Sequence, residues 1–153
     1  MSEAKVSSAL KKGLLAAGCY VWKTNDARTV GVPDIVGCTG LGRHIVAETK
    51  FVKAWPKRPS ASLLVGHKIT YAQAKHLTEV ASRRALAFVA IGCPGDRGVD
   101  CYIIPWEKWA RLGTNGWGEN VPYDLARAEL LIPAHRCAGS MSSTFSPPAA
   151  LVG

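Results

Sequence analysis

Two acidic residues and a lysine stand close together in an otherwise apolar stretch of the sequence, residues 31–51. Asp34 precedes one short apolar run, whereas Glu48 and Lys50 end a second run that follows a glycine-rich turn. Because side chains alternate along a strand, Glu48 and Lys50 share one face, and a hairpin can bring Asp34 close to it. Two carboxylates and an ammonium in apolar surroundings are costly without a partner, and a divalent cation is the natural one.

The elements that must position these residues can be read from apolar spacing and from turn residues. The pattern first predicts a helix over 3–17, a strand over 19–22, and a hairpin with strands at 35–36 and 45–47 and a turn at 37–43. An irregular segment over 51–65 and a helix over 70–84 follow. The pattern then predicts a strand buried on both faces over 86–91, a turn over 93–98, a strand over 100–104 and a short helix beginning at Pro105.

This order predicts an α/β fold, with a mixed central sheet and helices on its faces. A chain of 153 residues is long enough for one domain, which we place at residues 1–138. Its core is expected over about 3–105, followed by an extension over 106–138 that contains a loop at 113–122 and a short helix at 123–131. Residues 139–153 lack periodicity and are expected to form a loose tail.

The net charge of +8 indicates a polyanionic partner, of which nucleic acid is the first candidate. The first residues are too polar for a signal peptide, and no apolar run approaches membrane-spanning length. We therefore expect a cytoplasmic protein, in a bacterial cell or a phage-infected host, with no membrane partner. The five scattered cysteines show no metal-binding or disulfide spacing and are expected to act as small buried hydrophobes.

Basic residues are concentrated in one part of the sequence, residues 51–84, where seven of them are opposed only by Glu79. Such a run is often just a solvated face. Its sign bias, its irregular setting and the presence of Trp55 favour nucleic-acid binding instead.

The order Glu3, then Pro33-Asp34, then Glu48-Thr49-Lys50, then a helix with Gln73 resembles the PD-(D/E)xK nuclease superfamily. The ExK motif follows the PD motif by fourteen residues, and the resemblance spans about residues 3–105. It implies a restriction-endonuclease-like αβββαβ core.

Within that superfamily, residues 31–37 (GVPDIVG) with the later ETK are similar to VRR-NUC nucleases and to the Holliday junction resolvases of archaea and phages. The order of Gln73, residues 87–89, residues 102–105 and residues 121–123 is similar to the resolvases of Gram-positive recombination. The present chain is shorter than those proteins and has no clear equivalent of their protruding stalk.

The resemblance implies a hydrolytic site that uses Mg²⁺, with Mn²⁺ as a substitute. Asp34, Glu48 and the backbone carbonyl of Thr49 would bind the metal. Lys50 would position the attacking water and stabilise developing charge. Glu3 would complete a second metal position or hold a metal-bound water.

Each of these residues also has a plain structural interpretation. Asp34 could belong to a turn, Glu48 and Lys50 to an exposed charge pattern, and Glu3 to a favourable helix N-terminus. Gln73 lies in the sequence Thr70-Tyr71-Ala72-Gln73, which is typical of a capping box. It could equally contact the substrate or a metal-bound water, so both interpretations stay open.

Seven basic residues are candidates for contact with DNA: Arg28, Lys53, Lys57, Arg58, His67, Lys68 and Lys75. His44 is expected to be an ordinary strand-end residue. Trp106, Trp109 and Trp117 are expected to pack the C-terminal end of the fold or a subunit interface.

Together these features predict a Mg²⁺-dependent, structure-selective DNA endonuclease, specifically a Holliday junction resolvase that cuts branched, four-way DNA as a homodimer. Two alternatives remain open. One is a sequence-specific or nicking restriction-like endonuclease, and the other is a DNA-binding module that keeps the fold without cutting.

Overall fold

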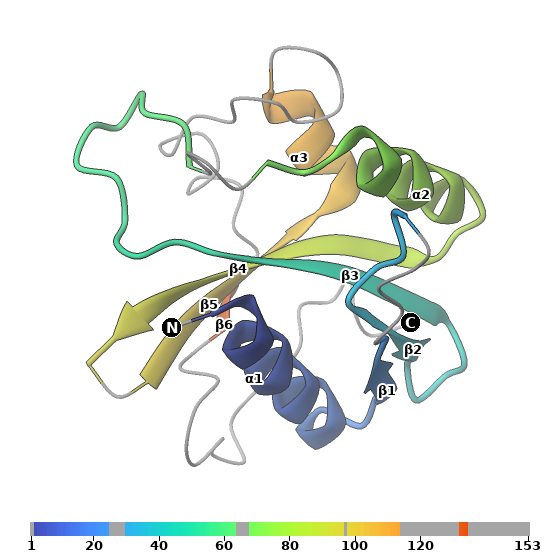
Figure 1. Cartoon of the computed structure of the whole chain (residues 1–153). Helices are drawn as coiled ribbons and strands as arrows, with labels where there is room; N and C mark the ends of the chain where they lie inside the picture. The colour runs from blue at the N-terminus through green and yellow to red at the C-terminus, as the bar shows by residue number, and fades with distance from the viewer. Residues whose placement is uncertain (1, 25–29, 64–67, 97, 114–131, 135–153) are drawn as a thin grey trace.

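The structure is a computed structural model in which residues 2–24, 30–63, 68–96, 98–113 and 132–134 are described. A single sheet forms the middle layer, one helix covers one face, and two helices cover the other (Figure 1). The elements are α1 (Glu3–Ala16), β1 (Tyr20–Lys23), β2 (Ile35–Cys38), β3 (His44–Phe51), α2 (Tyr71–Ser82), β4 (Leu86–Gly95), β5 (Gly98–Pro105), α3 (Trp106–Leu112) and β6 (Ile132–Ala134).

The strands lie in the order β1-β2-β3-β4-β5-β6 within the sheet. All described neighbours pair antiparallel except β3 and β4, which are parallel and are connected through α2. A parallel pair requires a crossover of this kind, because the chain must return to the same end of the sheet. The order α1-β1-β2-β3-α2-β4 therefore confirms the predicted αβββαβ core of a mixed-sheet α/β fold.

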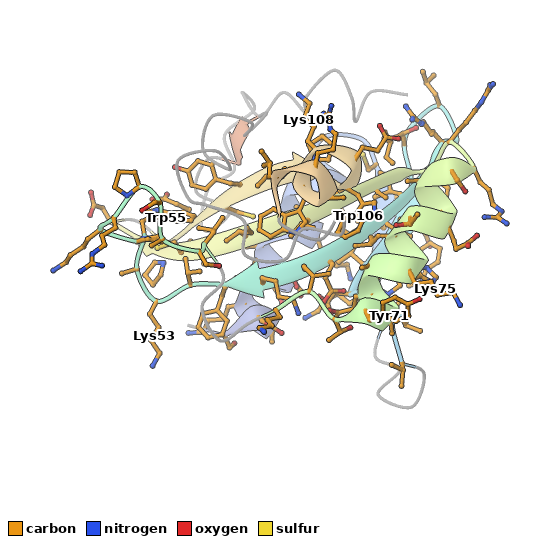
Figure 2. The ribbon with its side chains drawn as sticks, turned by 90° about the horizontal axis from the view of Figure 1, so that it is seen from above. Lys53, Trp55, Tyr71, Lys75, Trp106 and Lys108 are labelled. Atoms are coloured by element: carbon orange, nitrogen blue, oxygen red, sulfur yellow. The ribbon has the colours of Figure 1, made fainter. Side chains whose placement is uncertain are left out.

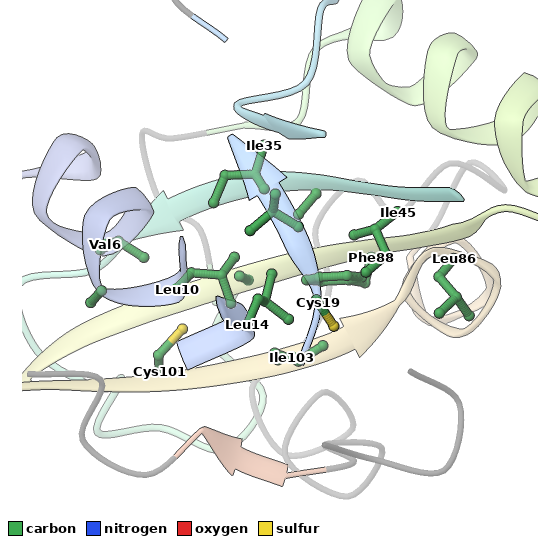
Figure 3. Close-up of a cluster of buried hydrophobic side chains, with 14 of the residues drawn as sticks. Val6, Leu10, Leu14, Cys19, Ile35, Ile45, Leu86, Phe88, Cys101 and Ile103 are labelled. Carbon is green, nitrogen blue, oxygen red and sulfur yellow. The ribbon is translucent and has the colours of Figure 1, made fainter. Parts of the chain in front are cut away.

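Helix α1 packs its apolar stripe on one face of the sheet. Val6, Leu10 and Leu14 recur at helical spacing and are almost completely buried. They meet Ile45 and Phe88 from the central strands in one hydrophobic cluster (Figure 3). We call this the α1 layer.

A second hydrophobic cluster, the α2 layer, lies on the opposite face, where α2 and α3 cover the sheet. Leu77 of α2 is buried there against strand residues such as Val46 and Val89. Trp106 and Trp109 of α3 complete the cluster, which confirms that these tryptophans pack the fold. Strand β4 is buried between the two layers, as its apolar sequence predicts.

The side chains of β3 alternate between the two layers. Ile45 and Ala47 join the α1 layer, whereas Val46 and Val52 join the α2 layer. The same alternation sends Thr49 toward α1 and sends Glu48 and Lys50 toward α2. One strand therefore supplies polar groups to both sides of the sheet at the same level.

The boundaries at two prolines differ from the predicted ones. The turn expected over 93–98 is shorter, because β4 continues to Gly95 and pairs there with Gly98 at the start of β5. Pro94 is accommodated in this ladder near the end of the hairpin, where a missing donor costs least. Pro105 stands at the N-cap of α3, one position before the first helical turn.

The other sequence predictions concern the cysteines, His44, the C-terminal part of the chain and membrane-spanning helices. Cys19, Cys93 and Cys101 are buried, as expected, and Cys38 is half-buried. His44 is exposed at the first position of β3. The helix over 123–131, most of the loop over 113–122, Trp117 and the tail over 139–153 lie outside the described residues. No described helix has the length and apolarity that crossing a membrane requires.

Candidate active site

The polar site forms where β3 loses its pairing with β2. The two strands pair from His44 to Ala47, and the chain of β2 begins immediately after Asp34. Beyond Ala47, the edge of β3 that faced β2 meets the Asp34 carboxylate, whereas the other edge still pairs with β4. Asp34 Oδ2 accepts hydrogen bonds from the amide of Thr49 at 2.8 Å and from its hydroxyl at 2.7 Å.

The backbone before β2 holds Asp34 in this position. Thr24 donates its amide to the Asp34 carbonyl at 2.9 Å, and its hydroxyl donates to the Pro33 carbonyl. Gly31 has a φ of +84°, and a Cβ there would lie 2.7 Å from the Ala72 carbonyl of α2. Only glycine fits this conformation and this approach, so Gly31 lets the segment pass directly against the start of α2.

Glu48 lies on the opposite face of β3 from Thr49, with its side chain only 3% exposed. Its Oε1 atom lies 3.1 Å from Lys50 Nζ and accepts a hydrogen bond from Gln73 Nε2 at 2.5 Å. Lys50 is itself buried, so a lysine and a carboxylate are desolvated together on an otherwise apolar layer. Such a pair is retained only where its hydrogen bonds are well made, and here both groups have partners.

The environment raises the pKa of Glu48 from its ordinary value of 4.5 to about 7. Burial contributes most, because it disfavours the charged form, and the nearby charge of Asp34 contributes next. Lys50 lowers the pKa, but its ammonium does not offset these two effects. Burial next to a second carboxylate therefore makes the ionised form of Glu48 costly, even with Lys50 beside it.

Glu3 reaches the same lysine from the other layer. Its Oε1 atom lies 3.9 Å from Lys50 Nζ, and its side chain is 41% exposed. Glu3 is the first residue of α1, where a carboxylate is also favourable for the helix. This contact brings Glu3 to the site, and its predicted role at a second metal position stays a prediction.

Gln73 forms the predicted capping box and also contacts Glu48, whereas its contact with substrate or a metal-bound water stays a prediction. Its backbone amide donates to Thr70 Oγ1 and its Oε1 accepts from the Thr70 amide, which forms the predicted capping box. Its amide nitrogen remains available and donates to Glu48. The side chain therefore connects the first turn of α2 to the buried carboxylate.

The arrangement has the chemistry of a site for a hard divalent cation. Among the described residues, the recorded contacts use only Oδ2 of Asp34 and Oε1 of Glu48, so the second oxygen of each carboxylate takes no hydrogen bond. No group of three His, Cys, Asp or Glu side chains gathers closely enough for a metal in the described part of the chain. Mg²⁺ is commonly held by one or two carboxylates, with waters and substrate phosphates, and this donor set fits that pattern.

Five of the seven predicted DNA-contact residues are exposed on the surface. Lys53 and Lys75 extend outward from the segment after β3 and from α2, respectively (Figure 2). Lys57, Arg58 and Lys68 are also exposed, whereas Arg28 and His67 lie outside the described residues. Trp55 is half-buried and packs edge-on against Tyr102, with 5.0 Å between the ring centroids, so packing explains this tryptophan.

One pair of site residues was not predicted from the sequence. Ser7 of α1 lies 2.7 Å from the Thr49 hydroxyl, and both hydroxyls are buried. The signal for Ser7 was present: it is a small polar residue four positions after Glu3, next to the apolar stripe of α1. The place of the Thr49 hydroxyl could be expected from strand alternation, because the Thr49 side chain must point to the face opposite Glu48.

Comparison with known proteins gives no family assignment. No family model matches the chain, and no curated protein matches it. Among solved structures it is similar to Hjc, a Holliday junction resolvase from the archaeal hyperthermophile Archaeoglobus fulgidus, with 23% sequence identity and a TM-score of 0.42. The match covers 63% of this chain and 72% of Hjc. This similarity is too low to assign a function.

Proposed function

We propose that this protein is a metal-dependent, structure-selective DNA endonuclease that hydrolyses phosphodiester bonds, specifically a Holliday junction resolvase. The observation that carries the proposal is the convergence of Asp34, Glu48 and Lys50 at the end of β3, where the buried Glu48 carboxylate lies 3.1 Å from Lys50 and feels the charge of Asp34. The motif resemblance of the sequence points to the same reaction. A protein that only bound DNA would gain nothing from two carboxylates placed where phosphate must approach.

A bound divalent cation would neutralise charge on the phosphoryl oxygens and acidify a water that serves as the nucleophile. Asp34 and Glu48 would hold it through their free oxygens. The Thr49 carbonyl is a further candidate, because the amide and carbonyl of one strand residue point the same way and the Thr49 amide points to Asp34. Mg²⁺ fits this oxygen donor set, and Mn²⁺ is expected to replace it.

The chain's own residues have separate roles in this mechanism. The Lys50 ammonium, held 3.1 Å from Glu48, would orient the attacking water and balance charge that develops on the phosphate. Gln73 would fix the orientation of the Glu48 carboxylate through its 2.5 Å hydrogen bond. Glu3, on the more exposed side of Lys50, would complete a second metal position or hold a metal-bound water.

The exposed basic residues would bring the DNA backbone to this site. Lys53, Lys57 and Arg58 follow β3 directly, and Lys75 projects from the helix that carries Gln73. Each contact with a phosphate releases counterions, so binding should weaken steeply as salt rises. Cutting a four-way junction requires two matched incisions, and one site per chain implies a homodimer.

The test is cleavage of three labelled substrates, a four-way junction, a linear duplex and a single strand, each with Mg²⁺ or with EDTA. Symmetric nicks in the junction alone, and only with Mg²⁺, are the expected result. Cutting of one duplex sequence would favour the restriction-like alternative. Binding without any Mg²⁺-dependent cutting would refute the nuclease assignment and leave the binding module.

Lys50→Ala provides the residue-level test of the same proposal. We expect it to abolish cleavage and to leave junction binding within a few-fold of the wild type, since Lys50 is buried and acts at the reacting group. Lys5→Ala removes the same charge from an exposed position of α1 and serves as the matched control. Loss of binding in Lys50→Ala alone would contradict the catalytic role.

A further inference from the structure

A chain of hydrogen bonds runs from α1 through the Thr49 hydroxyl to Asp34. Ser7 Oγ lies 2.7 Å from Thr49 Oγ1, and Thr49 Oγ1 lies 2.7 Å from Asp34 Oδ2. Ser7 also lies 3.0 Å from the backbone carbonyl of Glu3, in its own helix. The chain therefore connects the start of α1, where Glu3 stands, to the carboxylate at the end of the β2–β3 pairing.

The direction of the hydrogen bonds follows from the carboxylate. Ionised Asp34 can only accept, so the single hydroxyl proton of Thr49 is donated to Oδ2. The Thr49 oxygen is then free to accept, and Ser7 donates to it. The 2.7 Å contact to Thr49 is shorter than the 3.0 Å contact to the Glu3 carbonyl, which competes for the same Ser7 proton.

Core packing alone does not explain this pair of hydroxyls. Ser7 is 4% exposed and Thr49 is fully buried, next to the apolar α1 layer. Buried hydroxyls must be satisfied, whereas apolar groups of the same shape would fill the space at no such cost. The pair does provide Asp34 with a second donor on Oδ2, in addition to the Thr49 amide. Two donors on one oxygen fix the carboxylate plane and leave Oδ1 as the free atom.

We propose that Ser7 and Thr49 are positioning residues, whose hydroxyl chain holds Asp34 so that its free oxygen is presented beside Glu48 for a divalent cation. The inference rests on the proposed function. It adds residues whose hydroxyls touch neither the cation nor the DNA. Supporting groups of this kind typically change metal affinity or activity by about 10–100-fold when they are removed.

The test is Mn²⁺ binding to the full-length protein by calorimetry, with the melting temperature measured in parallel. Thr49→Val keeps the shape and the backbone amide but removes the hydroxyl, and we expect the Mn²⁺ Kd to rise about 10–100-fold. Thr49→Ser restores the hydroxyl and should return the Kd to within a few-fold of the wild type. Ser7→Ala should raise the Kd less, because the Thr49 bond to Asp34 remains.

Ser8→Ala is the matched control. Ser8 makes the same type of bond to its own helix, at 2.9 Å from the Ala4 carbonyl, but it is exposed, and its hydroxyl accepts from Lys23 Nζ at 3.1 Å instead of contacting Thr49. Its Mn²⁺ affinity should be unchanged.

Three outcomes are decisive. Unchanged Mn²⁺ affinity in folded Thr49→Val would overturn the inference while leaving the proposed function intact. If Thr49→Val does not fold, unchanged affinity in Ser7→Ala overturns it, and a weaker affinity sustains it. A wild-type protein that binds no Mn²⁺ would refute the proposed metal chemistry itself, together with the role given to the two hydroxyls.

Discussion

Replacing Glu48 by glutamine should change how the stability of the protein depends on pH. The side chain keeps its shape and loses its charge. In the wild type, burial and the Asp34 charge raise the pKa of Glu48 to about 7 from 4.5, so the native state binds the proton more tightly than the unfolded chain does. The resulting stabilisation is fully present below pH 4.5 and is lost as the pH rises through 7.

The magnitude follows from the two pKa values. The interval from 4.5 to about 7, at about 1.4 kcal/mol per pK unit, gives a total loss of about 3 kcal/mol. Most of it, about 2–3 kcal/mol, should be lost between about pH 5 and 8.5. Glu48→Gln should lack this loss. Comparing each protein with itself at two pH values cancels the constant effect of removing a partner from Lys50.

The measurement is urea unfolding in EDTA at both pH values, for the wild type and Glu48→Gln. Glu79→Gln is the control, because Glu79 is an exposed carboxylate whose pKa is lowered by its hydrogen bond to Arg83. It should keep the wild-type loss of stability at high pH. Equal pH dependence in the wild type and Glu48→Gln would refute the assignment of a raised pKa to Glu48.

Three further substitutions test how the fold builds the site. Gly31→Ala should lower the free energy of unfolding by about 2–4 kcal/mol in chemical denaturation, since it adds left-handed strain and a clash with α2 at Ala72. A decrease under about 0.5 kcal/mol would contradict the close approach of Gly31 to α2. Leu10→Ala should cost about 2–5 kcal/mol through the cavity left in the α1 layer, again by denaturation, whereas the exposed Leu15→Ala should cost far less. Gln73→Ala should cost about 1 kcal/mol through loss of the capping box and should also slow cleavage, because Glu48 loses a donor. Unchanged cleavage in that variant would limit Gln73 to its capping role.

The elements of the fold were predictable where the local signal was strong. The apolar stripe of α1, the capping box of α2 and the apolar run of β4 all appear in the structure where the sequence predicts them. The end of β4 was misplaced because Pro94 and Gly95 are typical turn residues. Tertiary pairing with β5 keeps them in a strand, and a local pattern cannot report such pairing.

The site was predictable in its residue types but not in its connections. Alternation along β3 correctly placed Glu48 and Lys50 on one face, and both contact each other. The contact between Glu3 and Lys50 depends on how α1 crosses the sheet, which sequence spacing does not determine. The same is true of Ser7 and Thr49, which are 42 positions apart and meet only through packing.

Strand β3 continues past the first residue of β2, and this difference in length bears on self-association of the protein. A strand that continues past its neighbour offers unpaired amides to any other extended chain, which is a common route to aggregation. Here the Asp34 carboxylate occupies the amide of Thr49 and places a negative charge at that opening. The residue proposed to bind a metal therefore also covers a stretch of β3 backbone that β2 leaves unpaired. Loss of this carboxylate would remove a barrier to self-association along with the chemistry.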